Sequence, residues 1–204
     1  ESRGLGDVYK RQVYTFSTEN WSREEYEVSF LMEFNVDLLE RRRDELNDLG
    51  VRVRFMGDLE DPRIPPVLLD RIADAEALTR DNTTMNMVFA FNYGGRSEIV
   101  DAMKRIAAKV ADGQMTPDSI GLDTVASHLY IPEMPDPDVV IRTSGEQRTS
   151  NYLLWEAAYS EYVFTPVLWP DFDRGELARC VAEYEARDRR FGGAVDGSLD
   201  GSEG

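Results

Sequence analysis

Five polar and aromatic side chains follow the first apolar segment of the chain, residues 13–16, at the point where that segment ends. They are Ser17, Thr18, Glu19, Asn20 and Trp21, and Arg23 lies close behind them. Glu19 and Asn20 carry groups that can handle a proton or position a group that must lose one. Trp21 offers an apolar wall, or it packs against the helix that follows. The sequence therefore indicates a site for proton chemistry at this strand end.

A second cluster has the chemistry of a phosphate site. Arg142 and Arg148 flank a Thr-Ser-Gly turn, and Thr149 and Ser150 stand at the start of a predicted helix. Guanidinium forks, hydroxyl groups and the N–H groups of a helix start are the donors that a phosphate needs. The alternative is a helix cap beside two arginines that pair with carboxylates. In a chain of net charge −16, a basic cluster at a strand end favours the phosphate site.

Two further strand ends carry polar groups. Residues 92–96 (NYGGR) follow an apolar strand, and the segment around Glu161 adjoins the last predicted strand. The one histidine, His128, is far from the opening motif in sequence and falls on a predicted apolar helix. We expect its ring to be packed in the core, so a nucleophile activated by histidine is not predicted.

These residues need a scaffold that positions strand ends. Apolar runs predict strands at residues 13–16, 51–56, 85–91, 139–142 and 162–164. Helical periodicity predicts helices from an S-x-x-E capping box at 22–25 to Gly50, and at 65–78, 97–110, 150–159 and 175–187. This alternation is typical of the α/β class, with a parallel sheet flanked by helices. Ligands of such sheets bind beyond the carboxyl ends of the strands, where the polar residues occur.

The composition narrows the class of protein. The 39 acidic residues outnumber the 23 basic ones, and the few lysines are Lys10, Lys104 and Lys109. Such a surface indicates ordinary acidic solubility or a cytoplasm of very high salt, of the haloarchaeal type. Binding to nucleic acid is not expected, because no basic stripe is available for phosphates. With Cys180 alone and no apolar run long enough to span a membrane, a cytoplasmic protein is expected.

The order of the motifs resembles one known family. FSTENWSR, FNYGGR, IRTSGEQRTSNYLLW, YSEYVF, LWPDF and RRFGG occur in this order across residues 13–193. This is similar to the pattern of cis-prenyltransferases, the isoprenyl diphosphate synthases that include undecaprenyl and dehydrodolichyl diphosphate synthases. The resemblance implies a six-stranded parallel sheet flanked by helices, a homodimer, and contact with the membrane periphery for release of a lipid product. It also implies an Mg²⁺-dependent condensation of isopentenyl diphosphate with an allylic diphosphate primer, repeated to give a long-chain polyprenyl diphosphate.

The resemblance assigns roles by position. Asn20 resembles the residue that accepts or positions the proton, and Glu161 resembles a magnesium ligand. The residues that resemble the lining of the allylic substrate site are Ser17, Thr18, Glu19, Trp21 and Arg23. Those that resemble the clamp for isopentenyl diphosphate are Arg142, Arg148, Thr149 and Ser150. Arg190 and Gly192 resemble the C-terminal Arg-x-Gly that reaches the diphosphate site across the dimer.

The start of the chain departs from the family pattern. The family's front motif is a phosphate loop of the form D-G-N-G-R-W, and nothing in residues 1–12 (ESRGLGDVYKRQ) matches it. DVYKRQ can be encoded by a transposon end used to build sequencing libraries, so we predict that residues 1–12 are not native. We expect a catalytic domain at 13–193 that lacks its first strand and phosphate loop and is inactive as it stands, followed by a disordered acidic tail at 194–204. The alternative is a non-catalytic partner subunit of a heteromeric cis-prenyltransferase.

Overall fold

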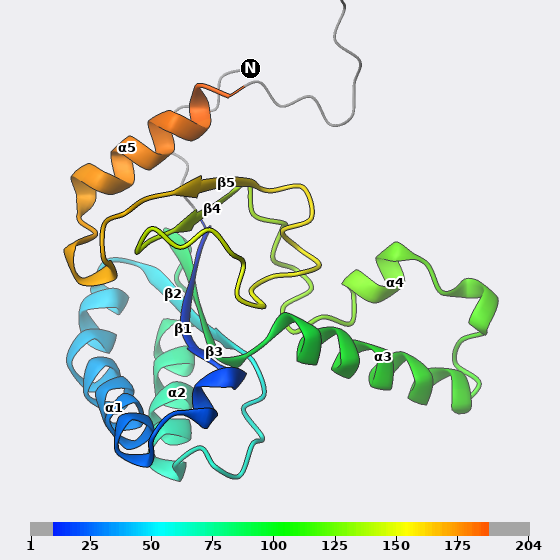
Figure 1. Cartoon of the computed structure of the whole chain (residues 1–204). Coiled ribbons are helices and arrows are strands. Elements are labelled where there is room, and N and C mark those ends of the chain that lie inside the picture. Colours follow the sequence, from blue (N-terminus) through cyan, green and yellow to red (C-terminus); the bar gives the residue numbers. More distant parts are fainter. Residues whose placement is uncertain (1–9, 188–204) are drawn as a thin grey trace, which may run out of the picture. The chain divides into compact units, whose positions relative to one another are not determined.

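The structure, a computed structural model, describes residues 10–187 (Figure 1). These residues form two compact units. The first unit contains residues 10–134 and 151–153, and the second contains residues 135–150 and 154–187. Every strand pair in the described residues is parallel, which confirms the predicted parallel α/β class.

The sheet of the first unit has the strand order β1-β3-β2. Its strands are β1 (Lys10–Ser17), β2 (Val51–Met56) and β3 (Met85–Tyr93). The prediction for residues 51–56 is confirmed at both ends, whereas β1 and β3 are longer than predicted. Lys10 pairs with Asn86, so β1 begins before residue 13. The origin of residues 1–12 stays a prediction.

A register shift at Thr15 sets the carboxyl end of β1. Tyr14 pairs with Ala90 and Phe16 pairs with Phe91, so Thr15 is the extra residue. The Thr15 hydroxyl donates to the Ala90 carbonyl oxygen at 2.9 Å, which keeps the irregular position bonded. Irregularities of this kind turn side chains at a strand end toward a new direction. Here the strand leads directly into the polar motif at Ser17.

Two helices, α1 (Glu25–Asp48) and α2 (Pro66–Thr79), build the core of the first unit with the sheet. The buried residues of this core are Phe16, Met32, Leu39, Val53, Ile64, Leu68, Ile72, Ala75 and Phe91. Gly50 ends α1 with φ +69, a conformation that favours glycine. The predicted capping box is wrong. Ser22 belongs to a preceding turn, and its hydroxyl donates to the Glu19 carbonyl oxygen at 2.7 Å.

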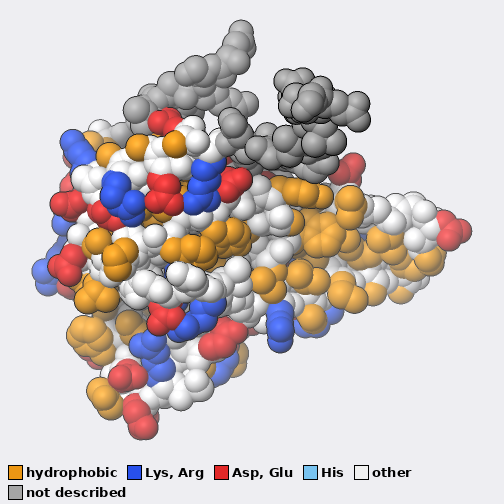
Figure 2. Space-filling view, turned by 45° about the horizontal axis from the view of Figure 1, so that its top comes forward, with side chains coloured by type: hydrophobic (Ala, Val, Ile, Leu, Met, Phe, Trp, Pro, Cys, Tyr) orange, Lys and Arg blue, Asp and Glu red, His pale blue; other side chains and the backbone are white. Residues whose placement is uncertain are grey.

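The helix α3 (Gly95–Ala111) and the short helices η2 (Pro117–Ser119) and α4 (Leu122–Ala126) complete the first unit. Apolar side chains gather on the surface over α3 and α4 (Figure 2). The exposed large apolar residues of α3, α4 and the segment between them are Val100, Met103, Ile120 and Leu122. His128 lies in the turn after α4 instead of on a helix. The predicted burial of its ring is confirmed, with Nδ1 2.7 Å from the Thr124 carbonyl oxygen.

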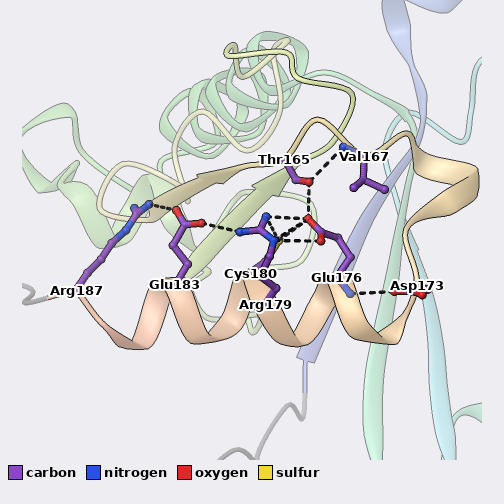
Figure 3. Close-up of polar contacts among 8 residues, drawn as sticks. All are labelled: Thr165, Val167, Asp173, Glu176, Arg179, Cys180, Glu183 and Arg187. Carbon is purple, nitrogen blue, oxygen red and sulfur yellow. Dashed lines mark hydrogen bonds and ion pairs between the residues drawn. The ribbon is translucent and has the colours of Figure 1, made fainter.

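The second unit contains the parallel strands β4 (Val139–Arg142) and β5 (Glu161–Phe164), the turn η3 (Trp169–Asp171) and the helix α5 (Arg174–Glu185). Asp173 caps α5 by accepting from the Glu176 N–H at 2.9 Å. A row of hydrogen bonds and ion pairs runs along this helix and reaches the Thr165 hydroxyl just after β5 (Figure 3). These polar bonds join α5 to the end of β5.

The predicted helix at residues 150–159 is wrong, because those residues form turns. Ser150, Asn151 and Leu153 have φ values of 49°, 62° and 47°. A right-handed helix requires negative φ at every position. The residue types suited a helix, but the backbone takes a left-handed path that propensity does not reveal.

Candidate active site

The motif that follows β1 folds into one turn of 3₁₀ helix, η1 (Thr18–Ser22). The Ser17 N–H donates to Asn20 Oδ1 at 2.8 Å, which closes the turn at its start. The Ser22 hydroxyl closes it at its end, and the Arg23 N–H donates to the Asn20 carbonyl oxygen at 3.1 Å. The structure therefore brings the predicted residues 17–21 together in a single compact turn.

Both carboxylate oxygens of Glu19 are held. Thr18 Oγ1 donates to Oε2 at 3.1 Å, and Asn151 Nδ2 donates to Oε1 at 2.7 Å. Burial acts to raise the pKa of Glu19, but these hydrogen bonds, that from Asn151 above all, outweigh burial and lower the pKa. The side chain is nevertheless exposed. Glu19 thus presents an ionised carboxylate of fixed orientation to solvent.

Asn20 uses one end of its amide within the turn. Its Oδ1 accepts from the Ser17 N–H. In the part of the chain that the structure describes, its Nδ2 donates to no protein group. A neutral amide is a poor base, and the oxygen is already bonded. The geometry therefore favours positioning, and not proton acceptance, for this side chain.

Trp21 is held on three sides. Its Nε1–H donates to Asn92 Oδ1 at 2.7 Å, its ring meets Phe16 edge-on at 5.0 Å, and the Arg63 guanidinium lies 4.4 Å from its centroid. The ring is partly buried against the core described above. Trp21 is therefore an anchor of the turn as well as an apolar surface.

The partners of Trp21 were not predicted from the sequence. Asn92 is buried, has φ 47°, and donates from Nδ2 to the Asp58 carbonyl oxygen at 2.8 Å and to Asp61 Oδ2 at 3.2 Å. Hydrogen bonds from Arg63 lower the pKa of Asp61 to about 2. The local signals were the polar strand end that begins at Asn92 and an Asp-x-Arg spacing in the loop after β2. The contact of this loop with Trp21 spans too many residues for a pattern to reveal.

The predicted clamp lies in the second unit. Arg142 is the last residue of β4, and its buried Nε has no hydrogen-bond partner among residues 10–187. Arg148 is exposed and forms an ion pair with Glu146. The sequence left open the alternative that both arginines pair with carboxylates. Among residues 10–187, Arg148 forms such a pair and Arg142 does not. The predicted helix start at Ser150 is wrong, since residues 151–160, directly after it, are not helical.

Glu161, the first residue of β5, forms an ion pair of 3.0 Å with Arg187. Within the described ranges, no three Asp, Glu, His or Cys side chains gather as a metal site. Glu161 offers carboxylate oxygens, which suit Mg²⁺, but it is one side chain. The described residues alone therefore do not form a complete magnesium site. The predicted residues Arg190 and Gly192, and the tail at 194–204, lie outside the described residues.

Comparisons with known proteins bear on this geometry. The model of a prenyltransferase family described as "Putative undecaprenyl diphosphate synthase" matches residues 7–192. Isoprenyl transferase 2 of Streptomyces avermitilis is 50% identical over 188 residues, which cover 92% of this chain and 65% of that protein. Decaprenyl diphosphate synthase of Mycobacterium tuberculosis is 49% identical over 182 residues, which cover 89% of this chain and 61% of that protein. The chain therefore spans less than two thirds of the length of these two curated relatives.

A solved structure agrees with the sequence comparisons. It is lavandulyl diphosphate synthase from Lavandula x intermedia in complex with dimethylallyl diphosphate, which is 38% identical with a TM-score of 0.87. The match covers 90% of this chain and 79% of that one. Motifs, sequence and fold agree, and the resemblance predicted from the motifs is confirmed. The chain belongs to the cis-prenyltransferase family, the family of the undecaprenyl diphosphate synthases.

Proposed function

We propose that this protein joins isopentenyl diphosphate to an allylic isoprenyl diphosphate, repeatedly and with cis geometry, to give a long-chain polyprenyl diphosphate. The observation that carries the proposal is the buried Nε of Arg142 at the end of β4, which has no partner among the described residues. A buried donor left unpaired costs about 1–3 kcal/mol, and more when it is charged. A diphosphate oxygen would remove that cost. The relatives named as decaprenyl and lavandulyl diphosphate synthases support this class of substrate.

The proposed reaction exchanges one bond for another. The bond between the allylic carbon and its diphosphate oxygen breaks, and diphosphate leaves with the electron pair. The double bond of isopentenyl diphosphate supplies the electrons of the new carbon–carbon bond. A proton lost from the adjacent carbon then restores a double bond. The protein must therefore bind two diphosphates and position the departing proton.

Basic side chains would bind the diphosphates. Arg142 and Arg148 would contact isopentenyl diphosphate, with Arg148 exchanging Glu146 for a substrate oxygen. Arg23 would contact the allylic diphosphate, because its exposed guanidinium has no carboxylate partner in the described residues. The other residues proposed to line the two substrates are Ser17, Thr18, Glu19, Trp21, Thr149, Ser150, Arg190 and Gly192. Guanidinium forks suit this task since they can donate two parallel hydrogen bonds.

Asn20 would position the proton that leaves. Its Nδ2–H donors are unused by the protein in the described residues, and its Oδ1 is held by Ser17. These donors can orient a diphosphate oxygen or a water molecule that takes the proton. Asn20 would then act mostly in the transition state and contribute little to substrate affinity.

Mg²⁺ remains part of the proposal. Because no three Asp, Glu, His or Cys side chains gather as a metal site in the described residues, diphosphate oxygens would have to complete the coordination of Mg²⁺, with Glu161 as a protein ligand released from Arg187. When bound, it would neutralise charge on the departing diphosphate.

The assembly and location of the protein are proposed as well. A homodimer is supported by the exposed apolar surface over α3 and α4, which a second copy would cover. No helix in residues 10–187 is both long enough and apolar enough to cross a membrane. A cytoplasmic enzyme that meets the membrane surface to release its lipid product would suit this proposal.

Substitutions in the clamp test the function. The assay uses a form of the protein extended at its N-terminus by a segment with the D-G-N-G-R-W loop, with labelled isopentenyl diphosphate and an allylic primer. Arg142→Ala and Arg148→Ala should each raise KM for isopentenyl diphosphate about tenfold to a hundredfold, because a charge-assisted bond contributes about 1.5–3 kcal/mol. Arg148→Lys should restore the KM for isopentenyl diphosphate only in part. Arg80→Ala, an exposed arginine with a 4.0 Å contact to Asp81, is the matched control.

Three outcomes separate the alternatives. An unchanged KM in both alanine variants would show that the clamp is assigned wrongly. Binding of isopentenyl diphosphate without chain elongation by the extended protein would favour the non-catalytic partner subunit. Chain elongation by residues 1–204, assayed beside the extended form, would contradict the expectation that this chain is inactive as it stands.

A further inference from the structure

We propose that Asn151 is a positioning residue that ties the carboxylate of Glu19 to the amino end of α3. This inference rests on the proposed function and adds a residue to which the motif resemblance assigned no role. Three hydrogen bonds carry it. The Asn151 carbonyl oxygen accepts from the Gly95 N–H at 2.7 Å, and its Oδ1 accepts from the Arg96 N–H at 2.9 Å. Its Nδ2 donates to Glu19 Oε1 at 2.7 Å.

The contacts of Asn151 use each of its polar groups for a different purpose. The first N–H groups of a helix have no partner within the helix. Asn151 satisfies two of them at α3 and still has a donor for a carboxylate. An aspartate could accept from α3 but could not donate to Glu19, and a glycine could bond only through its backbone. The side-chain amide is therefore the group that joins Glu19 to α3.

The backbone of Asn151 is suited to this residue type. Its φ of 62° lies in the left-handed region, which asparagine adopts more readily than most residues other than glycine. The next residue, Tyr152, anchors the segment by stacking on Tyr14 at 4.6 Å and meeting Tyr93 edge-on at 5.9 Å. The position of the Asn151 amide is thus fixed by the backbone conformation of Asn151 and by the ring contacts of Tyr152.

Gly94 separately indicates that the side chains of Thr18 and Asn151 must pack closely against the backbone here. A Cβ added to Gly94 would lie 2.6 Å from Thr18 Oγ1 and 2.7 Å from Asn151 Nδ2. These are the two side chains that donate to the carboxylate of Glu19. Glycine at position 94 therefore leaves the space in which both donors of Glu19 are placed.

The consequence for the proposed reaction is one of geometry. With Thr18 on Oε2 and Asn151 on Oε1, the carboxylate is held at a fixed position in the allylic motif. Without the tie, Glu19 can rotate into solvent, and the motif loses part of its pre-organisation for the transition state. Asn151 would therefore affect turnover, through Glu19, more than the binding of isopentenyl diphosphate.

The test is a double-mutant cycle with Asn151→Asp and Glu19→Gln in the extended protein. Asn151→Asp keeps the acceptor for α3 and replaces the donor to Glu19 with a like charge. We expect kcat to fall about tenfold, with KM for isopentenyl diphosphate changed less than about twofold. In the Glu19→Gln background, the same substitution should change kcat less than about twofold, since the amide then at position 19 can donate to the new carboxylate at position 151. Equal losses in both backgrounds would overturn the inference.

A second readout separates this inference from the proposed function. Urea midpoints of the same four chains, measured on residues 1–204, should be non-additive because the two side chains are in contact. Additive shifts of the urea midpoint would refute the hydrogen bond between Asn151 and Glu19, even if the enzyme is active. Non-additive midpoints, together with no polyprenyl product from the extended protein, would support the hydrogen bond between Asn151 and Glu19 and refute the function. If Asn151→Asp does not fold, Asn151→Gly, which accepts a φ of 62°, takes its place. It removes the donor to Glu19 together with the side-chain acceptor for α3, so kcat should again fall about tenfold, and an unchanged kcat would overturn the inference.

Discussion

Asn92→Gly tests how the opening motif is joined to the fold. The buried side chain of Asn92 makes three hydrogen bonds, one each with Trp21, Asp58 and Asp61. Glycine accepts the φ of 47° without strain, so this substitution removes the bonds and leaves the backbone unstrained. The loss in free energy of unfolding then measures the hydrogen bonds by which Asn92 of β3 holds the loop after β2 and the turn η1.

The magnitude follows from the bonds. A buried hydrogen bond contributes about 0.5–1.5 kcal/mol net, so three bonds amount to roughly 1.5–4.5 kcal/mol. The free energy of unfolding should therefore fall by about 3 kcal/mol. Asn92→Ala should cost about 1 kcal/mol more, because a side chain with Cβ is strained in the left-handed region.

The assay is equilibrium unfolding of residues 1–204 in urea, followed by circular dichroism. The midpoint should shift while the slope with urea stays the same. Trp21→Phe, which removes the indole donor and reduces the ring packed against Phe16 and Arg63, is the companion variant and should cost at least about 1 kcal/mol. Together the two should be non-additive, because they share one bond. An unchanged midpoint for Asn92→Gly, or additive effects, would refute the reasoning.

Two predictions concern charge. Hydrogen bonds from Arg179, and then from Thr165, lower the pKa of Glu176 to about 2 from 4.5. The stabilisation that ionised Glu176 contributes is therefore complete above about pH 4.5 and is lost as the pH falls toward 2. Glu176→Gln should flatten the dependence of the free energy of unfolding on pH in this range. An unchanged pH profile would contradict the lowered pKa of Glu176. If the net charge of −16 is an adaptation to high salt, the thermal midpoint should rise between 0.01 M and 1 M potassium chloride, since the Debye length falls from about 30 Å to about 3 Å. A thermal midpoint unaffected by salt would exclude the adaptation to high salt and favour ordinary acidic solubility.

Local pattern was sufficient for most of the elements. The strands β2 and β4 begin and end at the predicted residues, because both segments are rich in the β-branched residues that favour strands. The end of α1 was predicted at Gly50 for an equally local reason, its positive φ. The order of motifs along the chain likewise needed no structure. These features depend on neighbours in sequence.

The errors have two sources. The S-x-x-E pattern at Ser22 fits a cap, but its hydroxyl makes a competing local bond to the Glu19 carbonyl oxygen within η1. The second source is contact between residues that are distant in the sequence. The segment after Ser150 has helical residue types, yet Asn151 bonds to Glu19, which is 132 residues away in the sequence. Such contacts outweigh propensities of a few tenths of a kcal/mol per residue.

The sequence by itself determined the residue types of the site, the parallel class of the sheet and the family, because these depend on composition, periodicity and motif order. Only the tertiary structure decided which atoms of those residues are engaged. It places the oxygen of Asn20 on Ser17, Trp21 on Asn92, and Glu19 on Asn151. The physical reason is that a side-chain hydrogen bond requires its two atoms to lie within about 3 Å, and folding, not sequence spacing, sets that distance.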